Sequence, residues 1–197
     1  MIHASTNGLL LAGGFSRRYG SDKREVLYRG RTLAARAFSA LSAAVSGEVF
    51  VAAGQPARRP AGLPNATLLA DAVPDAGPLG GIVAGLSRSR RGLLVLACDL
   101  PLVRDSTLLV VAALGVRLGR PVAPRGPSGL EPLAAYYPGW TLKPLEAGLR
   151  ERILAPHLWL ERLGCLAVEG LEPGQFANIN RPKDLADLGG RKGRRRP

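Results

Sequence analysis

The stretch TNGLLLAGGFSRRYGSDK, residues 6–23, joins a short apolar run to a glycine-rich loop with two arginines and a lysine. The apolar run stops at Gly13-Gly14, a pattern that predicts a short buried strand. Glycines let backbone amides approach an anion closely, and the cations would neutralise phosphate charge. The loop has neither the Walker Gly-Lys-Ser/Thr ending nor the G-x-G-x-x-G spacing of a dinucleotide site. It therefore predicts phosphate binding of another kind, with a basic surface turn as the alternative.

Strand and helix patterns alternate beyond this stretch. Three more apolar runs predict strands, at residues 48–53, 66–70 and 93–98. Helical periodicity lies between and after them, at residues 32–45, 79–86 and 106–118. Less regular patterns follow, with strands expected at 122–123, 133–137 and 166–168, and helices at 140–149, 152–163 and 182–188. Apolar strands with helical crossovers predict an α/β fold, a mostly parallel central sheet covered by helices on both faces.

Three strand ends carry residues suited to a ligand. Ligands of parallel sheets bind at the carboxyl ends of the strands, so Gly13-Gly14, Asp71 and Asp99 are expected to converge in one cleft. Asp99 closes the most apolar run, and Mg²⁺ takes one or two carboxylates together with substrate phosphates. Asp99 is therefore a candidate metal ligand, with a helix cap as the alternative. Asp71 follows the strand predicted at residues 66–70, and a ligand contact and a turn explain it equally well.

Two further motifs are weaker. Residues 77–81, Gly-Pro-Leu-Gly-Gly, could bring the start of a helix close to a ligand or form a plain turn. Asn178 and Asn180 are two residues apart, which places both amides on one side of an extended segment. They could hold a substrate, or they could form a turn before the final helix. The chain has two histidines and two cysteines, so a zinc site is not expected.

Composition limits the other possibilities. The 197 residues suit one domain, for which we expect residues 1–190, followed by a basic, disordered tail at 191–197. Five of the cations behind the net charge of +12 lie in that tail. Aromatic residues make up only 5%, which disfavours a nucleic-acid-binding surface built on base stacking, although that reading stays open. No apolar run is long enough to span a membrane and no signal peptide is present, so a cytoplasmic location is expected.

In combination, the motifs resemble those of the molybdenum cofactor guanylyltransferases, a branch of the Rossmann-like nucleotidyltransferases. Residues 11–23 match the family's Leu-Ala-Gly-Gly-x-Ser-x-Arg-Met-Gly-x-Asp-Lys, and Asp71 with residues 77–81 matches a second motif. Residues 98–101, Cys-Asp-Leu-Pro, match a third, and residues 178–185 resemble the C-terminal Asn-x-Asn-Thr-Pro-Glu-Asp-Leu. The resemblance runs from about residue 8 to 188. It departs at Tyr19, where methionine is usual, and at Glu131, where the family often has His or Gln. Arg181 and Lys183 replace Thr and Glu in the last motif, and Ala52 stands where some members have a polar residue.

The resemblance implies a reaction in which GMP passes from GTP to the terminal phosphate of molybdopterin, with or without molybdenum, and pyrophosphate leaves. It implies that the backbone at Leu11, Ala12 and Gly13 contacts the nucleotide. Lys23, helped by Arg18, would bind the phosphates and stabilise the leaving pyrophosphate. These positions match the family's first motif one by one.

The remaining roles come from the other motifs. By the same resemblance Asp71 contacts guanosine, Asp99 holds Mg²⁺ between the phosphates, and Asn178 and Asn180 line the pterin side. We expect a monomer whose partners are GTP, molybdopterin and the molybdoenzymes or chaperones that receive the product. A cytidylyltransferase using CTP is the nearest alternative, although Gly13 favours guanine; a sugar-phosphate or isoprenoid nucleotidyltransferase and a non-catalytic adaptor are more distant.

Overall fold

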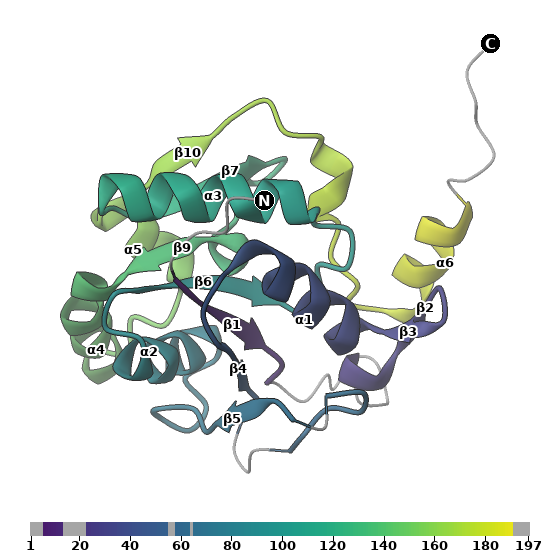
Figure 1. The fold of residues 1–197 in the computed structure, drawn as a ribbon, viewed down its shortest axis with the longest axis horizontal. Coiled ribbons are helices and arrows are strands. Elements are labelled where there is room, and N and C mark those ends of the chain that lie inside the picture. The colour runs from purple at the N-terminus through teal and green to yellow at the C-terminus, as the bar shows by residue number, and fades with distance from the viewer. Residues whose placement is uncertain (1–5, 14–22, 55–57, 64, 191–197) are drawn as a thin grey trace.

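A central sheet organises the molecule. The computed structural model describes residues 6–13, 23–54, 58–63 and 65–190 (Figure 1). Within these residues the sheet has the strand order β10-β7-β9-β6-β1-β4-β5, and β8 pairs with β7. Its strands are β1 (Asn7–Leu11), β4 (Val49–Ala52), β5 (Thr67–Leu69), β6 (Gly92–Ala97), β7 (Val122–Gly126), β8 (Gly129–Leu130), β9 (Tyr136–Pro138) and β10 (Leu166–Val168). A separate hairpin joins β2 (Leu27–Tyr28) to β3 (Arg31–Thr32).

Helices cover both faces of the sheet, as predicted. The α-helices are α1 (Leu33–Ala44), α2 (Pro78–Arg88), α3 (Asp105–Leu118), α4 (Leu142–Arg150), α5 (Pro156–Arg162) and α6 (Pro182–Gly190). Short 3-10 turns are η1 (Lys23–Glu25), η2 (Pro132–Ala134), η3 (Gly139–Thr141) and η4 (Pro173–Phe176). Helix α1 packs beside α3, and α2 packs beside α4 (Figure 1). None of the helices in the described ranges has the length and hydropathy needed to cross a membrane.

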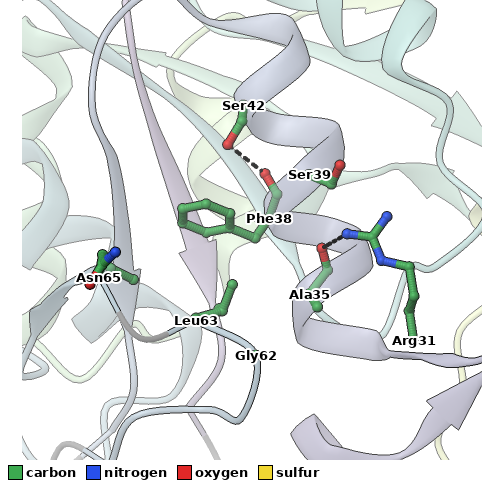
Figure 2. A pocket seen from close by; sticks show the side chains of 9 residues that line it. Arg31, Ala35, Phe38, Ser39, Ser42, Gly62, Leu63 and Asn65 are labelled. Carbon is green, nitrogen blue, oxygen red and sulfur yellow. Dashed lines mark hydrogen bonds between the residues drawn. The ribbon is translucent and has the colours of Figure 1, made fainter.

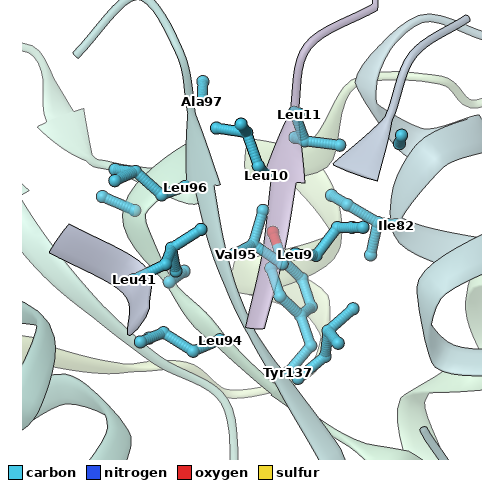
Figure 3. Close-up of a cluster of buried hydrophobic side chains, with 14 of the residues drawn as sticks. Leu9, Leu10, Leu11, Leu41, Ile82, Leu94, Val95, Leu96, Ala97 and Tyr137 are labelled. Carbon is cyan, nitrogen blue, oxygen red and sulfur yellow. The ribbon is translucent and has the colours of Figure 1, made fainter. Parts of the chain in front are cut away.

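The core lies where β1 and β6 are covered on both faces. Side chains alternate across a strand, so Leu9 and Leu11 point toward α2, whereas the β1 face at Gly8 points toward Leu41 of α1. Leucines, valines and isoleucine from both strands and helices fill the two layers (Figure 3). Tyr137 of β9 is fully buried among them, and its hydroxyl donates a hydrogen bond of 2.9 Å to the Pro132 carbonyl. Because helices cover both faces of these parallel strands, nearly every side chain along them is buried, and their sequences are continuous apolar runs.

The second half differs from the sequence-based expectation in three places. The strand expected at residues 122–123 is longer than predicted: it continues through the expected loop as β7 and forms a hairpin with β8. The strand expected at 133–137 begins instead as η2 and becomes β9, which runs antiparallel to β6. The helix expected at 152–163, with Pro156 as a kink or as its start, starts at Pro156, since proline disfavours helical backbone in the residue before it. Arg152 also has a φ of +60°, which lies outside the helical region.

Candidate active site

The register of the central strands brings the predicted strand ends together. Leu11 pairs with Ala97 of β6 and with Ala52 of β4, and Ala52 pairs with Leu69 of β5. The paired residues lie side by side across the sheet. The residue two positions after each of them in the chain is Gly13, Asp99, Gly54 or Asp71. They share the carboxyl edge of the sheet, as the sequence predicted. Neighbouring strands lie about 4.8 Å apart, so the three strand spacings from β6 to β5 put Asp99 and Asp71 roughly 14 Å apart along this edge.

The ends of β1 and β4 approach each other through their backbones. Ala12 donates its N–H to the Ala52 carbonyl at 2.8 Å, which extends the parallel ladder past the last strand residue. A Cβ atom placed on Gly13 would lie 3.0 Å from the Gly54 nitrogen. A larger residue at position 13 would therefore push the two strand ends apart. Gly13 is also exposed, so its backbone is open to a ligand above the edge.

Helix α2 begins against the same edge and holds Asp71. The Ala72 N–H donates to the Gly80 carbonyl at 3.2 Å. A Cβ atom on Gly81 would lie 2.7 Å from Leu11 Cδ2, 2.9 Å from Ala52 Cβ and 3.5 Å from Asp71 Oδ1. The glycine therefore lets the first turn of α2 lie directly on the ends of β1 and β4. Asp71 is half-buried in this corner, and burial raises the pKa of its carboxyl above the ordinary value of 3.8.

Asp99 lies beside the C-terminal segment that carries the two asparagines. Its carbonyl accepts the Ile179 N–H at 2.9 Å, and its side chain is partly exposed. Ile179 is fully buried, in a small cluster with Tyr28 and Leu33. Asn178 and Asn180, on either side of Ile179, are exposed. The alternation confirms the extended segment predicted from the spacing and places both amides at the Asp99 end of the edge.

The same segment also forms a turn before the final helix, which was the alternative to substrate binding by Asn178 and Asn180. Asp184 Oδ2 accepts the N–H groups of Asn180 and Arg181, both at 2.8 Å, at the start of α6. These bonds lower the pKa of the Asp184 carboxyl, and the bond from Asn180 has the largest effect. The turn uses the backbone of Asn180, so a capping role and a substrate contact by its side chain are compatible.

Gln175 fixes the approach to this segment. Its side-chain oxygen accepts the hydroxyl of Thr107, in the first turn of α3, at 2.8 Å and the N–H of Arg104, the residue before the helix, at 3.3 Å. Its side-chain nitrogen donates to the Glu172 carbonyl at 3.2 Å. The residue is 2% exposed, so these bonds are shielded from water. Gln175 has no local sequence signal, because its partners lie about 70 positions earlier.

Glu131 is the acidic residue that the sequence interpretation did not place in the site. The antiparallel pairing of Leu94 with Tyr136, continued outward, would bring Glu131 level with Asp99. η2 interrupts the strand, yet the two carboxylates stay close enough to interact. Burial raises the pKa of Glu131, and the negative charge of Asp99 raises it further. Its side chain packs on Gly126 of β7, where an added Cβ atom would overlap Glu131 Oε1.

The cationic part of the predicted site is only partly described. Arg18 and Gly14, together with the side chain of Lys23, lie outside the described residues, as does the tail at 191–197. The backbone of Lys23 opens η1. η1 is held near the end of β4, because Arg24 Nη1 donates to the Arg58 carbonyl at 2.8 Å and to the Ala53 carbonyl at 3.5 Å. The chain therefore returns to the carboxyl edge at the lysine.

Two surface hollows of about 400 Å³ lie elsewhere. One lies between α1 and residues 62, 63, 65 and 66, where Phe38 and Leu63 face each other and Arg31 donates to the Ala35 carbonyl (Figure 2). Neither hollow is lined by a predicted site residue. Cys165 is half-buried, and burial raises the pKa of its thiol to about 11, so it is a poor nucleophile at neutral pH.

Comparison with known proteins identifies the family. The model of the MobA-like NTP transferase domain matches residues 8–162. The chain belongs to the MobA-like NTP transferase family. A probable molybdenum cofactor guanylyltransferase of Opitutus terrae is 32% identical over 187 residues, which cover 90% of this chain and 91% of that protein. The molybdenum cofactor guanylyltransferase of Pseudomonas aeruginosa is 34% identical over 185 residues, 91% of this chain and 92% of that protein.

Solved structures agree with this membership of the MobA-like NTP transferase family. The molybdopterin-guanine dinucleotide biosynthesis protein A of Archaeoglobus fulgidus superposes with a TM-score of 0.78 at 25% identity, covering 94% of this chain and 99% of that chain. The 2-C-methyl-D-erythritol 4-phosphate cytidylyltransferase of Thermus thermophilus has a TM-score of 0.66 at 20% identity and shares the fold. The expected α/β nucleotidyltransferase fold is therefore confirmed.

The donor set of this MobA-like NTP transferase suits a hard divalent cation. Among the described residues, no group of three or more His, Cys, Asp or Glu side chains gathers to hold a metal. Asp99 and Glu131 offer two carboxylates at one end of the edge. Mg²⁺ is commonly held by one or two carboxylates and completes its shell with water and substrate phosphates. The residues present therefore fit an ion that arrives with a nucleotide.

Proposed function

We propose that this chain is a molybdenum cofactor guanylyltransferase. It transfers GMP from GTP to the terminal phosphate of molybdopterin and releases pyrophosphate. The observation that carries the proposal is the strand register, which lines up Gly13, Asp71 and Asp99 on one edge about 14 Å long. The family membership and the names of the relatives support GTP as the donor and molybdopterin as the acceptor.

The nucleotide lies along the edge between β5 and β6. Asp71, in the corner beneath α2, accepts hydrogen bonds from guanosine, and its partly buried carboxylate gains from such donors. The backbone of Leu11, Ala12 and Gly13 runs under the nucleotide, where a side chain at position 13 would separate the strand ends. A preformed backbone cradle costs little reorganisation when the ligand binds.

The phosphates lie toward Asp99. When Mg²⁺ is bound there, it neutralises charge on the phosphates of GTP. Asp99 would hold the ion, with Glu131 as a second carboxylate beside it. Lys23, which the chain brings back to this edge, and Arg18 bind the phosphates and stabilise the negative charge of the leaving pyrophosphate. Each of these cations acts as a fixed counter-charge in a preorganised site.

The reaction requires positioning more than covalent chemistry. A terminal phosphate oxygen of molybdopterin attacks the α-phosphorus of GTP, and the bond from that phosphorus to the bridging oxygen of the β-phosphate breaks. The electron pair leaves with pyrophosphate. Asn178 and Asn180 line the pterin side, beside Asp99 and at the far end of the edge from Asp71. In-line transfer requires acceptor and leaving group on opposite sides of the α-phosphorus, so we propose that Lys23 and Arg18 hold the pyrophosphate on the side away from the two asparagines.

Nucleotide choice tests this proposal. Melting temperatures are measured with GTP, CTP, ATP or UTP in the presence of Mg²⁺, and GMP transfer to molybdopterin is followed from radiolabelled GTP. A ligand at a hundred times its Kd stabilises the folded state by about 2.7 kcal/mol, which corresponds to roughly 5–10 °C in a domain of this size. We expect that shift with GTP. A larger shift and faster transfer with CTP would make the chain a cytidylyltransferase.

The same preparation tests the other expectations. We propose that residues 1–190 are the catalytic domain and 191–197 a basic extension, and that the protein acts as a cytoplasmic monomer. Its product passes to molybdoenzymes or their chaperones. Light scattering of the purified protein reports the oligomeric state, and cell fractionation reports the location.

A further inference from the structure

A basic and apolar surface lies at the amino edge of the sheet, opposite the candidate active site. Its centre is a hollow of about 400 Å³. The residues that form it come from three separate segments and include Arg90, Arg91, Val116, Gly119, Tyr136 and Trp140. We refer to this hollow as the arginine–tryptophan pocket.

The pocket is far from the reacting groups. Strand β6 starts at Gly92, next to Arg90 and Arg91, and its opposite end leads to Asp99. Gly92 pairs with Pro138, so β9 ends at the pocket as well. Strand β6 is about 16 Å long from Gly92 to Ala97, and Asp99 follows in the turn beyond its far end. A molecule bound at the pocket would leave the carboxyl edge open.

Positive charge dominates the segments that meet there. Residues 88–92, 116–120 and 138–143 contain six arginines and lysines and no aspartate or glutamate. Arg90 and Arg91 are exposed. The side-chain ion pairs of the described chain join Arg104 to Glu172 and Arg125 to Glu169, and neither reaches the pocket. Of these cations Arg90 and Arg91 line the pocket, and no carboxylate of the described residues forms an ion pair with either.

Apolar side chains stand among these cations. Trp140 is 52% exposed, and its indole N–H donates to the Gly119 carbonyl at 2.8 Å, which fixes the ring at the rim. Val116 and Leu118 are 39% and 46% exposed on the adjoining end of α3. Tryptophan and arginine are enriched among the residues that carry binding energy in protein interfaces. An oriented tryptophan beside two arginines therefore offers an anchor point with a charged rim.

We propose that the arginine–tryptophan pocket docks an acidic segment of a partner protein, with one aliphatic side chain of that segment against Trp140 and Val116. A second copy of this chain fits poorly, because it would bring two sets of cations together. Single-stranded nucleic acid is favoured by several exposed aromatic rings that stack on bases, whereas here Trp140 is exposed and the ring of Tyr136 is buried. An acidic segment with an aliphatic anchor satisfies both the charge and the apolar surface.

Fluorescence anisotropy with defined probes tests this proposal. The probe is a fluorescein-labelled twelve-residue peptide of four Glu-Glu-Leu repeats, compared with the same peptide carrying serine for leucine and with a twelve-nucleotide oligothymidine. The variants are Arg90→Ala/Arg91→Ala, Trp140→Ser and the control Arg150→Ala/Arg152→Ala, which removes two exposed arginines outside the pocket. Melting temperature and GMP transfer are measured for each, and both should stay at the wild-type value.

The control pair makes the outcome decisive. We expect the leucine peptide to bind about tenfold more weakly to Arg90→Ala/Arg91→Ala than to the wild type, and within twofold of the wild type to the control. Trp140→Ser should weaken the leucine peptide and leave the serine peptide unchanged. Equal losses in the two double variants would show general attraction to a basic protein and overturn the proposal. Tighter binding of oligothymidine that depends on Trp140 would make the surface a nucleic-acid site instead.

Discussion

Replacing Gly81 with alanine tests whether the close approach of α2 to the sheet edge shapes the nucleotide site. The added Cβ would lie 2.9 Å from Ala52 Cβ and 2.7 Å from Leu11 Cδ2. Carbon atoms in contact lie about 3.5–4.0 Å apart, and Ala52 has no flexible side chain to move. The start of α2 must therefore retreat by about 0.6–1 Å. Asp71, whose Oδ1 would lie 3.5 Å from the same Cβ, moves with that corner.

The expected cost divides between stability and catalysis. Overpacking costs about 1–3 kcal/mol, and alanine regains about 1 kcal/mol of helix propensity over glycine. The net loss of about 0–2 kcal/mol lowers the melting temperature by at most about 8 °C. A displacement near 1 Å at a positioning group can reduce the rate about a hundredfold. We therefore expect kcat/KM for GTP in Gly81→Ala to fall about 10- to 100-fold.

Gly85→Ala is the matched control, one turn further along the same face of α2. Its added Cβ would lie 2.6 Å from Leu93 Cδ2 and 3.0 Å from Leu9 Cδ2, both ends of flexible side chains. It should lower stability by a similar or smaller amount and keep kcat/KM within about threefold. Steady-state kinetics and thermal unfolding of both variants provide the measurement. Equal kcat/KM values for Gly81→Ala and the wild type would refute the argument that this corner positions GTP.

Three further predictions concern charge, anchoring and the tail. Burial raises the pKa of Asp71 and Glu131 in the folded state, so ionising either carboxyl is harder in the folded than in the unfolded protein. The folded state therefore loses stability as the pH rises through these pKa values. Asp71→Asn and Glu131→Gln should therefore raise the melting temperature at pH 7.5, with a gain that shrinks in acid; an equal gain at pH 4.5 would contradict this. Gln175→Ala strips a buried acceptor from α3 and should cost about 1–3 kcal/mol in urea unfolding, whereas a loss below about 0.5 kcal/mol would show that the anchor is dispensable. Truncation after Gly190 should leave GMP transfer unchanged, and a large loss would show that the tail takes part.

The central strands could be predicted because burial on both faces leaves a simple signature. Each is a continuous apolar run ended by glycine or aspartate, and the predicted ends of β1, β4, β5 and β6 lie within about one residue of those observed. The β7–β8 hairpin carries no such signature. Pro124, Arg125 and Gly126 suggest a loop, and their strand exists because the Glu131 N–H and the neighbouring ladder supply partners from later in the chain.

The candidate site divides in the same way. Asp71 and Asp99 follow from the rule that ligands bind at the carboxyl ends of parallel strands, and the register places them there. The spacing of Asn178 and Asn180 predicts that both amides share one side of the chain, but their place beside Asp99 depends on the hydrogen bond from the Ile179 N–H to the Asp99 carbonyl. Glu131 could not be placed from periodicity, since its position beside Asp99 depends on the antiparallel pairing of β9 with β6. An acidic residue just before a proline that leads into a strand was its only local signal.

The rate of GMP transfer by Asp99→Asn, at saturating GTP and Mg²⁺, tests the central claim most directly. Asparagine keeps the size of the side chain and caps a helix as well as aspartate does, so a purely structural role predicts nearly unchanged turnover. Loss of one electrostatic contact in a preorganised site costs about 10²–10³ in rate, which is the decrease expected if the carboxylate holds the metal. Mn²⁺ binding followed by electron paramagnetic resonance should weaken in parallel. A folded Asp99→Asn protein with wild-type turnover and wild-type Mn²⁺ affinity would contradict the mechanism.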